Sequence, residues 1–171
     1  MQMYWDYNQK SMKKVIFTLL VILWMAVIFS FSAKPADQSE EMSQSVGRKI
    51  GELFEPGFEK WPESEQMAYA ERIDYPVRKC AHATEYIILG ILLMAVGESY
   101  RIGKKLRLAF VIGAAYACSD EIHQLFVPGR SGQVTDVLID CTGLLVGIIF
   151  VLLIQHIYKY ITRNKNNSEK M

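Results

Sequence analysis

The sequence predicts an all-α fold: a polytopic membrane protein with four transmembrane helices and an extracytoplasmic loop that carries short amphipathic helices. The apolar residues are concentrated in four stretches, and most charged residues fall between them. Each stretch has close to the ~20 residues that a helix needs to cross ~30 Å of hydrocarbon. The 171 residues leave room for one domain. A net charge of +1, without a basic stripe interleaved with aromatic residues, excludes a nucleic-acid-binding role.

The four stretches cover residues 15–31, 80–96, 106–127 and 134–158. The first contains no charged residue, and the fourth is apolar after Asp140. The two middle stretches also have spanning length, but they carry ionisable side chains, namely His82, Glu85, Asp120, Glu121 and His123. Because such groups are costly inside a bilayer, these residues carry the functional question.

The first stretch also has two features of a secretory signal peptide. Lys13 and Lys14 precede it, and the small-x-small pattern of residues 30–32 ends it. The apolar run is longer than the 7–15 residues typical of such a signal. We therefore expect a retained membrane anchor.

Basic residues assign sides to the loops, because short cytoplasmic segments carry an excess of Lys and Arg. They gather before the first helix, between the second and third, and after the fourth: Lys10, Lys13 and Lys14; Arg101, Lys104, Lys105 and Arg107; Lys159, Arg163, Lys165 and Lys170. Both termini are therefore expected in the cytoplasm. The predicted parts are a cytoplasmic N-terminus with the first helix (1–32), an extracytoplasmic loop (33–77), a three-helix core (78–158) and a cytoplasmic tail (159–171).

The extracytoplasmic loop shows helical periodicity. Its apolar residues recur at helical spacing in the first half, as Met42, Val46, Ile50 and Leu53. A second short helix is expected from Pro62, a residue suited to a helix start, to about Ile73. Two arrangements remain open: the helices lie on the outer membrane surface, or they pack on the outer ends of the transmembrane helices.

Polar residues share one face on each of the last three transmembrane stretches. His82 and Glu85 are three residues apart, and Asp120 and Gln124 are four apart. The candidate site comprises eight residues: His82, Glu85, Asp120, Glu121, Gln124, Arg130, Asp136 and Asp140. At 1.5 Å of rise per residue, the carboxylates of three separate helices lie roughly 10–14 Å from the outer loops. This common depth, shared by Glu85, Asp120 and Asp140, predicts one polar pocket that opens outward.

The turn at residues 128–132 adds a potential anion site. Pro-Gly favours a tight turn, and Ser131 is suited to cap the fourth helix. The free N–H groups of that helix, with Arg130, are able to hold a phosphate. A plain loop with a surface arginine is the alternative.

Structural roles also remain open for several of these residues. For His82 this role is a hydrogen bond to Glu85 or to a carbonyl group that holds helices together. Asp136 fits an exposed first turn favoured by the helix dipole. Arg78 and Lys79 are expected at the level of the lipid headgroups.

Three sequence motifs carry a family resemblance. In order they are Arg78-Lys79-x-x-His82-x-x-Glu85-Tyr86, Ser119-Asp120-Glu121-x-x-Gln124-x-Phe126-Val127-Pro128-Gly129-Arg130-x-Gly132, and Asp136-Val137-x-x-Asp140-x-x-Gly143. The chain resembles the VanZ-like family, bacterial membrane proteins named for a component linked to teicoplanin resistance. The motifs lie within residues 78–150, and the first helix is also similar to the family. This resemblance implies a place in the bacterial cell membrane, a role at the cell envelope and an effect on glycopeptide susceptibility.

Three functions are compatible with these residues. The first is binding of an anionic membrane lipid or a lipid-linked cell-wall precursor in the outward pocket. The second is a membrane-embedded hydrolase or transferase acting on a lipid phosphate, with a divalent cation held by Glu85, Asp120 and Asp140. The third is a small transporter or flippase in which one of these carboxylates exchanges protons. We rank them in this order, and whether the protein is an enzyme is left open.

Overall fold

In the computed structural model all regular secondary structure of the described residues is helical. The structure describes the backbone of residues 2–168 and the side chains of residues 9 and 11–165. Lys10 and Lys170, which entered the orientation argument, therefore lie outside the described side chains, as do residues 169–171 of the predicted tail. The helices are α1 (Gln2–Ser32), α2 (Ala36–Phe54), the 3-10 helix η1 (Phe58–Lys60), α3 (Glu63–Ser99), α4 (Lys105–Gln124) and α5 (Val134–Ser168). The all-α prediction is confirmed.

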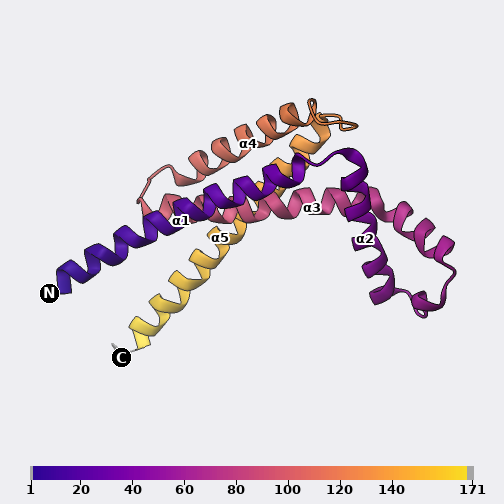
Figure 1. Ribbon diagram of the computed structural model, residues 1–171. Coiled ribbons are helices and arrows are strands. Elements are labelled where there is room, and N and C mark those ends of the chain that lie inside the picture. The colour runs from indigo at the N-terminus through magenta and orange to yellow at the C-terminus, as the bar shows by residue number, and fades with distance from the viewer. Residues whose placement is uncertain (1, 169–171) are drawn as a thin grey trace.

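Three helices are long and apolar enough to cross a membrane: α1 within Ser11–Ser32, α3 within Glu63–Ser99, and α5 within Val134–Lys165. The helix α4 has 20 residues but carries basic residues at its start and two adjacent carboxylates near its end. Its role as a fourth spanning helix stays a prediction. The start of α1 and the end of α5 lie at the same end of the molecule (Figure 1).

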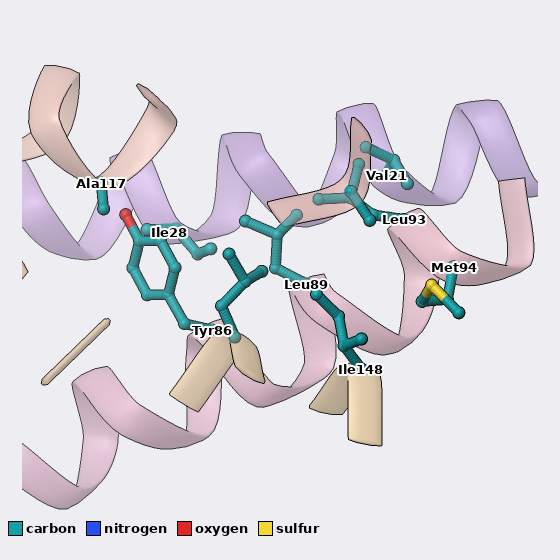
Figure 2. Packing of buried hydrophobic residues seen from close by; sticks show 10 residues of the cluster. Val21, Ile28, Tyr86, Leu89, Leu93, Met94, Ala117 and Ile148 are labelled. Atoms are coloured by element: carbon teal, nitrogen blue, oxygen red, sulfur yellow. The ribbon is translucent and has the colours of Figure 1, made fainter. Parts of the chain in front are cut away.

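The central helix is α3, which packs against each of the four other α-helices. Tyr86 and Leu89 on α3 are fully buried. Around them lie Ile28 of α1, Ala117 of α4 and Ile148 of α5 (Figure 2). The apolar core therefore joins four helices at the middle of α3, and the polar cluster lies on the turns of α3 that precede this core.

Small residues allow α3 and α5 to approach closely. A side chain at Gly143 would overlap the main chain of Ala83, and one at Gly147 would overlap the main chain of Ile87. Close backbone approach through glycines four residues apart is a common packing mode of membrane helices. Both residue numbers increase together in these pairs, so the two helices run parallel. This register brings the first turns of α5 against residues 79–83 of α3.

The helices α2 and α3 form a hairpin at the end opposite the termini (Figure 1). The 37 residues of α3 extend over roughly 55 Å at 1.5 Å per residue, so the helix is longer than a membrane is thick. Its first part packs against α2, whose buried residues are Ser43, Gly47 and Gly51. Phe58, fully buried, fills the closed end of the hairpin against Gly51.

The second short helix expected in the outer loop does not end near Ile73. Instead it continues without a break into the predicted transmembrane helix and passes through Pro76. Proline removes one helical hydrogen bond, but Asp74 and Arg78 form an ion pair of 2.7 Å across this turn. The Ser43 hydroxyl of α2 donates a hydrogen bond to the Asp74 carboxylate. These contacts stabilise the helix on both sides of the proline.

Candidate functional site

Two polar pairs connect α3 to the first turns of α5. The Lys79 ammonium forms an ion pair with the carboxylate of Asp136. One turn deeper, His82 Nδ1 lies 3.5 Å from Oδ1 of Asp140, whose side chain is fully buried. The parallel register set by the glycines of α5 places both pairs side by side. The face of α5 that packs against α3 is therefore polar in its first turns and lined by glycines further along the helix.

The helix α4 contributes a third group to this position. Glu121 is 5% exposed, and its Oε2 accepts a hydrogen bond of 2.8 Å from the Gln133 N–H before the start of α5. The other carboxylate oxygen, Oε1, is buried without a hydrogen-bond partner among the described residues. One ligand atom each from His82, Glu121 and Asp140 lies within 4.8 Å of the others. Three helices thus converge on one point.

Asp120 and Gln124 occupy the neighbouring face of α4, and each is only 3% exposed. The polar side chains beside Asp120 are Ser32 of α1 and Gln124 itself. Glu85 is half-buried on α3 and interacts electrostatically with His82, Asp120 and Asp140. The three carboxylates predicted at a common depth thus lie near one another in space.

A cleft of about 770 Å³ lies between α1, α2 and the N-terminal part of α3. Its walls are largely apolar, and include Trp24, Phe31, Met42, Val46, Ile50, Ile73, Val77 and Ile88. Polar groups also line it, namely Lys34, Arg78, His82, Glu85 and Arg130. His82 borders the cleft as well as the buried carboxylates. It connects the two.

Arg130 belongs to the turn between α4 and α5, which is fastened to the start of α2. The Ala36 N–H donates to the Pro128 carbonyl at 3.1 Å, and Arg130 Nη1 donates to the Ser39 hydroxyl at 2.9 Å. Burial lowers the pKa of the Arg130 guanidinium, and the nearby positive charge of Arg78 lowers it further. Arginine nevertheless stays protonated in proteins. The carboxylates of Glu121, Asp120 and Asp136 act in the opposite direction and favour the charged guanidinium.

Arg78 and Lys79 bind carboxylates of the protein: Arg78 pairs with Asp74 and Lys79 with Asp136. Their expected position at the level of the lipid headgroups stays a prediction. The alternative of an exposed Asp136 is wrong, because this residue is 5% exposed. The spacing of Asp74 and Arg78, four residues apart, was the available signal for one of these pairs.

The sequence interpretation did not identify Ser39 and Ser43 of α2 as neighbours of the polar residues. Ser39 accepts the bond from Arg130, and Ser43 donates to Asp74. Nothing in the local pattern distinguishes these serines from solvent-exposed ones. Their partners lie 91 and 31 residues away in the sequence.

With the geometry described, comparison with known proteins identifies the family. A family model described as VanZ/LLP1 matches residues 17–155. The chain belongs to the VanZ/LLP1 family. No curated protein and no solved structure matches it.

The VanZ/LLP1 match includes all eight candidate residues, together with the α2 hairpin that had shown no family motif in the sequence. Three helices of this family member have the length and composition to cross a membrane. The chain is therefore a VanZ-like protein of the membrane type. The structure brings seven of the eight candidates to one region, formed by the middle of α3, the end of α4 and the first turns of α5, with the eighth, Arg130, beside them in the cleft.

Proposed function

We propose that this protein binds an anionic lipid, or the lipid part of a lipid-linked cell-wall intermediate, at the outer face of a bacterial cell membrane. The observation that carries the proposal is the combination of an apolar cleft with a cationic turn. The residues of α3 that line the cleft run from Tyr69 to Ile88, roughly 28 Å along the helix at 1.5 Å per residue. This length suits an extended hydrocarbon chain.

Arg130 is the group best suited to hold the anionic headgroup. Its only side-chain hydrogen-bond partner among the described residues is the neutral hydroxyl of Ser39, and its Nε is buried without an acceptor. Guanidinium groups bind phosphate through two parallel hydrogen bonds. Arg78 lines the same cleft, and although it pairs with Asp74, its guanidinium has further N–H donors for a phosphate placed between the two arginines.

Lipid occupancy of the purified protein tests this proposal. We expect native mass spectrometry to detect added polyprenyl phosphate bound to wild type and at least tenfold less bound to Arg130→Ala. Arg107→Ala is the matched control, because Arg107 is an exposed arginine at the opposite end of α4. Equal occupancy in wild type and Arg130→Ala would remove the Arg130 site.

A second candidate function, hydrolysis or transfer of a lipid phosphate, is favoured by the pair of His82 and Asp140. A carboxylate orients an imidazole for proton transfer in many enzymes. His82 also borders the cleft, where a headgroup would lie. Phosphate release from polyprenyl diphosphate by purified wild type, abolished in Asp140→Asn, would support an enzyme. Lack of release with every divalent cation tried would leave binding alone.

The proposed role at the envelope extends to glycopeptide susceptibility. An expression strain carrying wild type is expected to differ in teicoplanin sensitivity from strains carrying Glu85→Gln or Asp140→Asn at matched protein levels. Both residues belong to the polar cluster, and each substitution replaces an ionisable carboxyl by an amide at nearly constant volume. Identical sensitivities would show that the cluster has no part in that phenotype.

A further inference from the structure

We propose that His82, Glu121 and Asp140 together bind one divalent transition-metal ion such as Zn²⁺. The three side chains come from α3, α4 and α5, and their nearest ligand atoms lie within 4.8 Å of one another. An ion at the centre of such a triangle lies about 2.8 Å or less from each atom, and zinc–ligand bonds measure about 2.0–2.2 Å. Side-chain movements of less than about 1 Å close this difference.

The unused polar atoms of these residues are the second observation. Both carboxylate oxygens of Asp140, Oε1 of Glu121 and Nδ1 of His82 are buried without an aligned hydrogen-bond partner in the described part of the protein. Asp140 is 0% exposed and Glu121 5% exposed. Buried polar groups are nearly always bonded. A cation requires several atoms with free lone pairs that face one point, and these atoms meet that requirement.

Charge balance supports the same conclusion. Two buried carboxylates are costly unless a positive charge neutralises them. Lys79, one turn before His82 on α3, is already paired with Asp136, and no Lys or Arg among the described side chains forms an ion pair with Glu121 or Asp140. A divalent ion neutralises both carboxylates and accepts the neutral imidazole as its third ligand.

The ligand types indicate which ions fit. Calcium and magnesium bind oxygen ligands almost exclusively, whereas an imidazole nitrogen with two carboxylate oxygens suits zinc and its neighbours in the first transition series. The hydrogen bond from Gln133 N–H to Glu121 Oε2 orients this carboxylate. Metal-binding side chains are commonly oriented by such hydrogen bonds from outside the coordination shell. Three protein ligands leave a fourth tetrahedral position open.

This open position connects the ion to the lipid site. A phosphate oxygen of the bound headgroup would complete the coordination, since His82 borders the lipid cleft. This last step alone rests on the proposed function. The metal site itself is tested without any lipid added.

The direct experiment measures metal content of purified protein in detergent after equilibration with Zn²⁺ and removal of excess ion. We expect about one zinc per chain in wild type, and Co²⁺ substitution should give the visible absorption band of a tetrahedral site. His82→Ala and Asp140→Asn should weaken zinc binding at least about tenfold. Glu121→Gln keeps an oxygen acceptor for Gln133 N–H, so it preserves the local fold while removing one anionic ligand.

Two control variants separate the site from adventitious binding. His156→Ala and Glu71→Gln remove exposed residues of the same chemical types away from the cluster, and both should bind zinc as wild type does. The inference is overturned if wild type and Glu121→Gln bind zinc equally, or if monodisperse wild type holds less than a tenth of a zinc per chain. Either result would indicate that the carboxyl groups are protonated instead. If wild type binds zinc but polyprenyl phosphate binds wild type and Arg130→Ala equally, only the lipid proposal is overturned.

Discussion

The ion pair between Lys79 and Asp136 makes the most quantitative prediction of this structure. Its side chains are 16% and 7% exposed, and it connects α3 to the first turn of α5. Removing one member of a buried pair costs about 3–5 kcal/mol, because the other charge is left buried without a partner. Lys79→Met keeps most of the length of the side chain and removes its ammonium group, which also lies 4.9 Å from the centroid of the Tyr75 ring. We expect a loss of about 3 kcal/mol of unfolding free energy, the lower end because Lys79 keeps some contact with solvent.

The double variant Lys79→Met/Asp136→Leu distinguishes a lost charge partner from lost packing. Replacing a buried ion pair by apolar residues of similar size is often neutral or stabilising. The double variant should therefore regain at least about 2 kcal/mol relative to Lys79→Met alone. A double-mutant cycle reports this coupling directly.

Chemical unfolding in detergent micelles, followed by circular dichroism, is the assay. The exposed pair of Lys49 and Glu52, with side chains 73% and 47% exposed, is the matched control. Lys49→Met should change the unfolding free energy by less than about 1 kcal/mol, as exposed ion pairs do. The reasoning is refuted if Lys79→Met is as mild as Lys49→Met, or if the two losses simply add in the double variant.

Three further substitutions probe the helix contacts that position the site. Gly147→Leu should push α5 away from α3 and lower the thermal midpoint, at a cost of about 1–3 kcal/mol for overpacking; an unchanged midpoint would contradict the close approach. In Gly51→Leu the new side chain would collide with the Phe58 ring, so limited proteolysis should cut the α2 hairpin faster than in wild type while the transmembrane helices stay resistant. Equal cleavage rates in wild type and the variant would argue against this packing. Trp24→Phe removes the 2.9 Å hydrogen bond from the indole to the Glu85 carbonyl and should cost about 0.5–1.5 kcal/mol in chemical unfolding; no loss would mean that water replaces the indole fully.

The apolar stretches of the sequence predict the helices well, because a membrane-embedded backbone must satisfy its own hydrogen bonds and helices do so locally. The same local rule predicts which polar residues share a face. His82 with Glu85 and Asp120 with Gln124 follow from spacing alone. The contact between His82 and Asp140 does not, because it depends on how two separate helices are aligned.

The outer loop shows where sequence patterns become ambiguous. Helical spacing of Met42, Val46 and Ile50 correctly indicates a helix, and such a face usually packs into a core. In the structure the small residues Ser43 and Gly47 of α2 pack against α3, while the larger apolar residues line the open cleft. Small residues permit the closer helix contact, and the larger ones are left for the cleft. Periodicity reveals that a face exists, but not what lies against it.

The pairing of Lys79 with Asp136 illustrates the same limit and also a way past it. In the sequence, Lys79 at a membrane boundary is equally well explained by lipid headgroups, since its partner is 57 residues away. The glycines four residues apart on α5 do carry the missing information, because a helix face without side chains lets a neighbouring backbone approach closely. Once Gly143 is aligned with Ala83, the parallel register brings Asp136 towards Lys79 and Asp140 towards His82. The glycines therefore do more than permit packing: they determine which charges meet, and a substitution there should alter the polar site without touching any of its residues.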